Sequence, residues 1–228
     1  MIPRAIITDI EGTTSSLSFV HDVLFPYSRA RIADHVRDHA DRLGPLLADV
    51  RTEAGDAGLD VDACIIQLIA WQDADRKIGP LKTLQGMIWA EGFADGSLQG
   101  HVYPDAVGGL RRWNARRISL YVYSSGSVAA QKLLFGHSVA GDLTPLFSGY
   151  FDTAISGKKD AASYRAIADA IDLPPADILF LSDVEAELAA AQSAGLAVTL
   201  LVRDAPLPDG AYRAVGDFDS ILPESLFA

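Results

Sequence analysis

Residues 5–14 read Ala-Ile-Ile-Thr-Asp-Ile-Glu-Gly-Thr-Thr. The apolar run at 5–7 predicts a short buried strand, and Gly12 predicts that the strand has given way to a loop. Asp9 and Glu11 are therefore expected where a strand ends. Ligands bind at the carboxyl ends of strands in open α/β sheets, although an aspartate in this position is also common as a simple turn residue.

The composition bounds the class of protein. The chain has 228 residues, of which 49% are hydrophobic, enough for one large domain or for a core with a smaller insert. The net charge of −11 disfavours nucleic acid and anionic membranes as partners. No apolar run approaches the roughly 20 residues of a membrane helix. Cys64 has no second cysteine to pair with, which fits a reducing compartment, and no signal peptide is evident, so we expect the protein in the cytoplasm. The acidic, mixed surface offers no specific oligomer signal, so we expect a monomer.

The region from residue 25 to about residue 95 shows helical periodicity and no convincing strand. Apolar residues recur there every three or four positions, as on the buried face of an amphipathic helix. The expected helices are Arg29–Arg42, Leu46–Ala57, Asp60–Arg76 and Leu81–Phe93. This succession predicts a small helical bundle.

Beyond residue 103 strands and helices alternate. The expected strands are Ile118–Tyr123, Phe147–Thr153, Asp177–Leu181 and Leu196–Arg203, and the expected helices are Asp105–Arg117, Val128–Phe135, Asp160–Ile171 and Glu185–Ala194. Such alternation predicts an α/β fold with a Rossmann-like parallel sheet and helices on both faces. Residues 1–15 and 103–228 would then form the core. Residues 16–102 would form an all-helical cap, inserted after the first strand and placed to act as a lid.

Polar side chains recur where the predicted strands end. Ser124 follows one strand, Asp183 follows another, and the pair Lys158-Lys159 comes between them in sequence. Each residue taken alone has a plain structural explanation, as a turn residue, a helix cap or a solvated lysine. Together with Asp9 and Glu11, however, they make one consistent set at adjacent strand ends.

This set suits phosphoryl transfer through an aspartyl phosphate, in which a carboxylate attacks phosphorus. Mg²⁺ prefers oxygen ligands, which Asp9, Asp183 and the Glu11 carbonyl would supply. Lys159 and the Ser124 hydroxyl would hold phosphate oxygens, helped by backbone amides at a helix start. The Glu11 side chain would protonate the leaving oxygen and later activate water.

The motifs resemble those of the haloacid dehalogenase superfamily of phosphatases. Residues 9–13, Asp-Ile-Glu-Gly-Thr, look like its first motif, usually Asp-x-Asp-Gly-Thr, while Ser124, Lys159 and Asp183 match the second, third and fourth. Glu11 in place of the second aspartate is similar to one branch, the enolase-phosphatases of methionine salvage. The flanking residues 18–27, 100–105 and 123–135 match that branch as well.

The resemblance implies an activity and a set of roles. The activity is enolisation of 2,3-diketo-5-methylthiopentyl-1-phosphate followed by removal of its phosphate, with one Mg²⁺ per subunit. Asp9 would be nucleophile and metal ligand, Glu11 a ligand through its backbone and the acid/base, and Asp183 a ligand. Ser124 and Ser125 would bind substrate and Lys159 the phosphate. We prefer Lys159 to Lys158 because it directly precedes the helix expected to begin at Asp160.

Other interpretations stay open at this point. One alternative is a phosphoacceptor signalling module, which uses a similar residue set but has no need of a helical insert. A second is a dehalogenase, which uses the aspartate without a metal, and a third is a phosphatase for another small phosphate ester. Glu187, one helical turn after Asp183, is either a residue beside the metal ligand or a solvated one. His35 and His39 are spaced as a metal pair but lack an evident third ligand.

Overall fold

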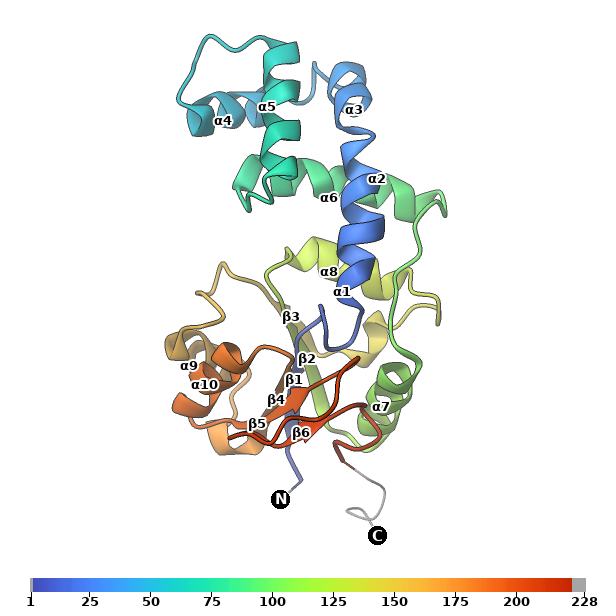
Figure 1. The fold of residues 1–228 in the computed structure, drawn as a ribbon, viewed down its shortest axis with the longest axis vertical. Coiled ribbons are helices and arrows are strands. Elements are labelled where there is room, and N and C mark those ends of the chain that lie inside the picture. The colour runs from blue at the N-terminus through green and yellow to red at the C-terminus, as the bar shows by residue number, and fades with distance from the viewer. Residues whose placement is uncertain (1, 223–228) are drawn as a thin grey trace. The chain divides into compact units, whose positions relative to one another are not determined.

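The computed structural model describes residues 2–222, and its backbone contacts divide the chain into two compact units (Figure 1). The helical unit is Ser18–Leu98, and the sheet unit is formed by the residues before and after it. The sequence-based limits of the insert, 16–102, stay a prediction of where the functional domains meet.

The sheet unit contains a parallel sheet. Within residues 2–222 this sheet has six strands in the order β3-β2-β1-β4-β5-β6. The strands are β1 Ala5–Thr8, β2 Ser119–Tyr123, β3 Gly149–Phe151, β4 Ile178–Ser182, β5 Ala197–Leu201 and β6 Ala214–Val215, and all neighbours run parallel. The expected α/β fold class is confirmed. The two-residue strand β6 was not expected, because so short a strand leaves no periodic pattern.

Helices cover both faces of this sheet (Figure 1). They are α7 Pro104–Ala115, α8 Val128–Gly136, α9 Ala161–Ala170 and α10 Glu185–Ser193, with short 3₁₀ turns at Thr144–Leu146 and Pro175–Asp177. On one face, Ala5 and Ile7 of β1 pack in one apolar cluster with Tyr164 of α9 and Leu188 of α10. Because both faces are covered, every residue of β1 is buried, which explains its unbroken apolar run.

The register of the sheet brings three strand ends together. Thr8, the last residue of β1, pairs with Val122 of β2 on one side and with Leu181 of β4 on the other. The residues that follow these strands, Asp9, Ser124 and Asp183, therefore leave the sheet at the same edge. The chain passes from one side of β1 to the other between β3 and β4, and such switch points are where open α/β sheets bind ligands.

The helical unit has its own apolar core. Its helices start with α1 Leu17–Phe19 and a π-helical turn at Val20–Leu24. They continue with α2 Phe25–Arg29, α3 Ile32–Asp38, α4 Gly44–Ala54, α5 Val61–Asp73 and α6 Gly79–Ala94. Val36, Leu47, Leu68 and Leu84 lie in one buried cluster with the thiol of Cys64. The expected run of helices is confirmed, and Cys64 is a packing residue.

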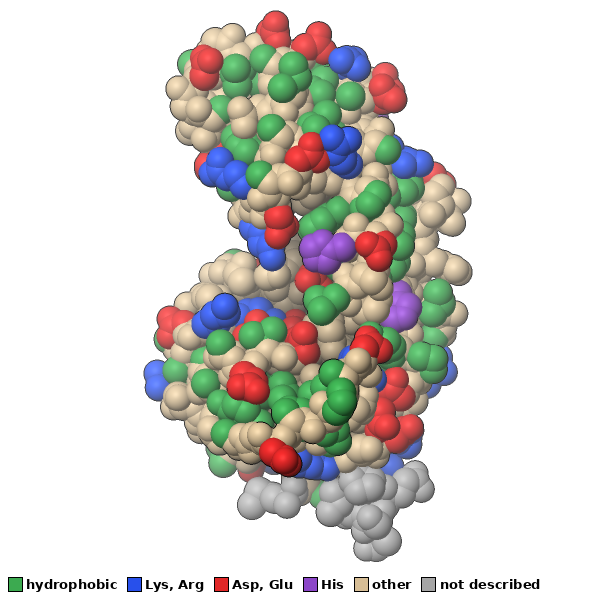
Figure 2. All heavy atoms as spheres, in the orientation of Figure 1, with side chains coloured by type: hydrophobic (Ala, Val, Ile, Leu, Met, Phe, Trp, Pro, Cys, Tyr) green, Lys and Arg blue, Asp and Glu red, His purple; other side chains and the backbone are tan. Residues whose placement is uncertain are grey.

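The surface of both units is mixed in charge. Figure 2 shows acidic and basic side chains interspersed on the visible face of each unit, with apolar ones between them. Among the residues that the structure describes, no helix is long and apolar enough to cross a membrane.

Substitutions of two apolar residues of α5, Leu68 and Ile66, provide a test of the core of the helical unit. Leu68 is completely buried, whereas the side chain of Ile66 is 69% exposed. We expect Leu68→Ala to lower the free energy of unfolding by about 2–5 kcal/mol, because it leaves a cavity, and Ile66→Ala to change it by less than about 0.5 kcal/mol. Urea unfolding followed by circular dichroism measures both, and equal losses would contradict the assignment of this core.

Candidate functional site

Asp9 is the central residue of the candidate site. It directly follows β1, is only 5% exposed, and donates its backbone N–H to the Leu181 carbonyl at 2.9 Å, as if the strand continued by one residue. Its own carbonyl accepts the hydroxyls of Thr8 at 2.9 Å and Thr14 at 3.1 Å. These hydrogen bonds hold Asp9 through its backbone and do not use its carboxylate.

The loop after Asp9 is compact and requires its glycine. The backbone amides of Thr13, Thr14 and Ser15 all point to the Ile10 carbonyl, and Gly12 donates to the Ser15 carbonyl at 2.8 Å. Gly12 has φ +71°, a left-handed conformation that side chains rarely adopt. A Cβ there would also come within 2.2 Å of the Asp183 carboxylate. The loop backbone and Asp183 are therefore in direct contact.

Asp183 carries an unsatisfied carboxylate. Its Oδ1 is buried and has no hydrogen-bond partner among the described residues. Burial, and next to it repulsion from the Asp9 carboxylate, raises the pKa of Asp183 to about 6. Two carboxylates at one strand edge, one of them with an oxygen that has no hydrogen-bond partner among the described residues, fit a hard divalent cation.

Lys158 neutralises part of this charge. Its Nζ lies 2.7 Å from Asp9 Oδ1 and 2.7 Å from Glu187 Oε2, and its side chain is only 10% exposed. Burial alone would lower the pKa of Lys158, but the two carboxylates outweigh it and raise the pKa above its usual value. Lys158 therefore stays charged. Burial and the nearby Asp9 carboxylate raise the pKa of Glu187, which also accepts the Ser182 hydroxyl at 3.0 Å.

The sequence favoured Lys159 over Lys158 for the phosphate, but the structure brings Lys158, and not Lys159, against Asp9; the phosphate-binding role itself stays a prediction. Lys159 is exposed, whereas Lys158 contacts Asp9. The reason is tertiary: the buried Tyr164 of α9 donates its hydroxyl to the Lys158 carbonyl at 2.7 Å, and Asp160 donates its amide to Gly157 to close the turn. These bonds set which of two adjacent lysines turns inward. Glu187, left open by the sequence, is buried in the site; its four-residue spacing from Asp183 was the available signal.

Ser124 and Ser125 lie in the loop between β2 and α8. Ser124 is buried, donates its amide to the Phe151 carbonyl at 3.2 Å, and accepts the Gly126 amide on its hydroxyl at 3.2 Å. Gln131 donates to the Gly126 and Phe151 carbonyls at 2.8 and 2.9 Å and so braces the loop. Glu11 is partly buried in the loop after β1. All the predicted residues except Lys159 thus lie at or beside the strand edge occupied by Asp9.

Across residues 2–222, no three His, Cys, Asp or Glu side chains cluster as a metal-binding group. His35 and His39 do not form a metal pair: His35 Nδ1 lies 3.3 Å from Glu91, and His39 Nδ1 lies 2.9 Å from the His35 carbonyl.

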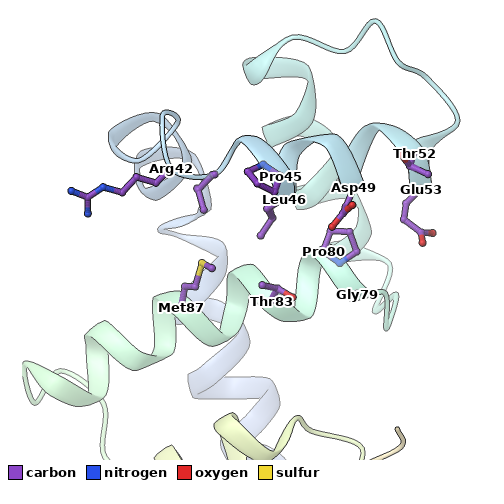
Figure 3. Close-up of a pocket in the computed structure, with 11 residues that line it drawn as sticks. Arg42, Pro45, Leu46, Asp49, Thr52, Glu53, Gly79, Pro80, Thr83 and Met87 are labelled. Atoms are coloured by element: carbon purple, nitrogen blue, oxygen red, sulfur yellow. The ribbon is translucent and has the colours of Figure 1, made fainter.

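A cavity of about 490 Å³ lies within the helical unit, between α4 and the first half of α6. Figure 3 shows Leu46 and Asp49 of α4 facing Thr83 and Met87 of α6 across it. Its wall is mainly apolar and carries charges of both signs, and none of the predicted site residues lines it. The chemistry-bearing residues are therefore those of the sheet unit.

Comparison with known proteins identifies relatives of the chain. A sequence model of the haloacid dehalogenase-like hydrolases matches residues 3–195. The chain is 57% identical over 225 residues to the Enolase-phosphatase E1 of Methylococcus capsulatus, covering 98% of this chain and 99% of the relative. It is 56% identical over 226 residues to the Enolase-phosphatase E1 of Pseudomonas aeruginosa, covering 98% and 100%.

Solved structures give the same picture of the fold. The UTR4 protein of Saccharomyces cerevisiae is 31% identical with a TM-score of 0.83, covering 96% of this chain and 100% of that one. The L-2-haloacid dehalogenase of Xanthobacter autotrophicus is 17% identical with a TM-score of 0.60, covering 99% of each chain, a likeness that speaks for the fold alone.

The two adjacent lysines provide a matched test of the site's electrostatics. We expect Lys158→Met to lower the free energy of unfolding at pH 7.5 by about 3–5 kcal/mol, because it leaves buried carboxylates without their cation. Lys159→Met should change it by less than about 0.5 kcal/mol, since that side chain is exposed. Urea unfolding in EDTA measures both. Equal losses would show that Lys158 is not the paired cation.

Proposed function

Since the chain belongs to the haloacid dehalogenase-like hydrolases and, within them, to the Enolase-phosphatase E1 proteins, we propose that it enolises 2,3-diketo-5-methylthiopentyl-1-phosphate and then removes the phosphate. The product is the acireductone 1,2-dihydroxy-3-keto-5-methylthiopentene, an intermediate of methionine salvage. The chain is thus a hydrolase of a phosphate monoester that works through an aspartyl phosphate.

One observation carries this proposal. The buried Asp9 carboxylate lies 2.7 Å from the Lys158 ammonium, and burial, with repulsion from Asp9 next to it, raises the pKa of Asp183. A carboxylate nucleophile facing a phosphate dianion needs cationic surroundings, because the two anions repel each other. Lys158 supplies one such charge.

Mg²⁺, on which enzymes of this family generally depend, would supply the other when bound. The Asp9 and Asp183 carboxylates and the Glu11 carbonyl would hold one ion per subunit, and the unpartnered Oδ1 of Asp183 supports this assignment. When bound, the ion stabilises the negative charge that develops on the substrate's oxygens.

The phosphatase half-reaction has two steps. An Asp9 oxygen attacks phosphorus, the bond from phosphorus to the ester oxygen breaks, and Glu11 gives that oxygen a proton. Water then attacks the aspartyl phosphate, Glu11 takes a proton from it, and phosphate leaves with Asp9 restored. Lys158 takes the phosphate-binding role that the sequence suggested for Lys159, because its Nζ already lies against the nucleophile.

Ser124 and Ser125 complete the phosphate site in this proposal. The buried Ser124 hydroxyl and the backbone at the start of α8 would hold the phosphate oxygens that face away from Lys158. The enolisation moves a proton from C1 of the substrate to the oxygen on C2 before the phosphate is removed.

The setting of the enzyme is also part of the proposal. We assign it a small-molecule substrate, a monomeric state and the cytoplasm, with residues 1–15 and 103–228 as the catalytic core and 16–102 as a helical cap. The buried single cysteine and the mixed acidic surface support these assignments.

Asp9→Asn tests the proposed activity. With the diketo phosphate and Mg²⁺, we expect the wild type to give an enol absorbance before inorganic phosphate appears. Asp9→Asn should release phosphate at least about 1,000-fold more slowly, since an amide is not a nucleophile toward phosphorus. Near-normal release by the variant would remove Asp9 as nucleophile. A wild type inert to this substrate but active on simple phosphate esters would overturn the substrate alone.

The raised pKa of Asp183 predicts a pH dependence of the metal effect. The folded state holds this proton more tightly than the unfolded state, so in EDTA stability should fall as pH rises from about 4 through about 6. Above that range Mg²⁺ should restore stability, and at pH 5 it should do so much less, because the proton competes with it. Thermal unfolding with EDTA or Mg²⁺ measures this. In Asp183→Asn both effects should shrink, and an unchanged response would contradict the assignment of Asp183 as a ligand.

A further inference from the structure

Arg203 follows β5 and points into the sheet unit. Its side chain is only 8% exposed, and its Nε and Nη2 both donate to the Thr13 carbonyl, at 3.0 and 2.5 Å. Thr13 is separated from Arg203 by 190 residues and belongs to the loop that carries Asp9 and Glu11. The buried guanidinium thus donates two hydrogen bonds to one backbone oxygen of residues 9–13, which we call the nucleophile loop.

The rest of the guanidinium is fixed as well. Nη1 donates to Asp105 Oδ2 at 2.7 Å and to the Gly216 carbonyl at 3.3 Å. The same Asp105 oxygen accepts the Phe218 amide at 2.9 Å. The rings of Tyr103 and Phe218 lie 4.2 and 5.2 Å from Arg203 Cζ. Arg203 therefore ties the start of α7 and the segment after β6 to the loop after β1.

The loop has a specific need for this contact. The backbone amides of Thr13, Thr14 and Ser15 all donate to the Ile10 carbonyl, so none of them donates to the Thr13 carbonyl. Thr13 is completely buried. A buried carbonyl without a donor costs free energy, and the loop would rearrange to reach one. Such a rearrangement would move Gly12, whose backbone contacts Asp183, and the adjoining Glu11 carbonyl.

Arginine suits this position better than lysine. Its planar fork offers donors in a rigid arrangement that reaches the Thr13 carbonyl and the Asp105 carboxylate at once. A lysine keeps the charge but presents a compact ammonium, which cannot span both acceptors with the same geometry. The aromatic rings of Tyr103 and Phe218 favour the flat guanidinium in the same way.

We propose that Arg203, oriented by Asp105, is a positioning residue of the phosphatase centre that holds the Asp9–Thr13 loop in the shape that binds Mg²⁺ and phosphate. This inference rests on the proposed function and deepens it. Arg203 does not touch the reacting atoms; it acts through the Thr13 carbonyl.

The test compares Arg203→Lys and Asp105→Asn with the control Arg213→Lys. Arg213 also donates to backbone carbonyls of the sheet unit, those of Ser220 and Ile221 at 2.6 and 2.9 Å, but neither belongs to the nucleophile loop. The measurements are the Mg²⁺ dissociation constant by titration calorimetry, the thermal midpoint in EDTA, and kcat and KM for both the diketo phosphate and p-nitrophenyl phosphate.

We expect Arg203→Lys to weaken Mg²⁺ binding and to lower kcat for p-nitrophenyl phosphate, each by about 10–100-fold, as when a residue supporting a metal ligand is lost. Asp105→Asn should show the same changes to a smaller degree, because Arg203 keeps its bonds to Thr13. Arg213→Lys should leave both quantities within about twofold of the wild type, whatever its thermal midpoint.

Wild-type Mg²⁺ affinity and kcat in Arg203→Lys, or losses matched by Arg213→Lys, would overturn the inference. If Arg203→Lys does not fold, the same measurements on Asp105→Asn decide it, and an unchanged Asp105→Asn would then overturn it. A wild type that hydrolyses p-nitrophenyl phosphate but not the diketo phosphate would contradict the proposed substrate, while the Arg203 comparison would still be read from p-nitrophenyl phosphate and Mg²⁺ binding.

Discussion

Charge balance at the edge of the sheet is the constraint on which the rest of the structure depends. Asp9, Asp183 and Glu187 bring their carboxylates to one partly buried place, and Lys158 bridges two of them at 2.7 Å each. Burial, and next to it repulsion from the Asp9 carboxylate, raises the pKa of Asp183, and its Oδ1 has no hydrogen-bond partner among the described residues. A protein would not keep such a cluster for stability, because buried like charges cost free energy. In the proposed function, a bound cation would offset part of this negative charge.

The fold supplies this arrangement through the topology of a parallel sheet. With β1 central and β2 and β4 beside it, the residues after these strands necessarily emerge together. Strands covered by helices on both faces are held rigidly by packing, so the polar residues placed at their ends are held rigidly too. The site needs little structure of its own beyond the compact loop at Gly12 and the two turns that present Ser124 and Lys158.

Support for that loop comes from distant parts of the chain. The Thr13 carbonyl meets a guanidinium that follows β5, which in turn is held by a carboxylate at the start of α7. Tyr164 of α9 acts in a comparable way on Lys158 through its backbone carbonyl. Residues of distant elements thus hydrogen-bond to the backbone of two segments of the candidate site, the loop after β1 and the turn at Lys158.

The sequence by itself determined the α/β class, the helical insert, and the candidate residues Asp9, Glu11, Ser124 and Asp183, because periodicity and motifs at strand ends are local patterns. It favoured Lys159, whereas Lys158 is the lysine against Asp9; adjacent residues of a turn have the same local signal, and the bonds that fix this turn, from Tyr164 and Asp160, form only in the folded protein. It also gave no sign of Arg203, whose partners Thr13 and Asp105 lie 190 and 98 residues away. Contacts of that range depend on how the strands are ordered in the sheet, and only the tertiary structure decides them.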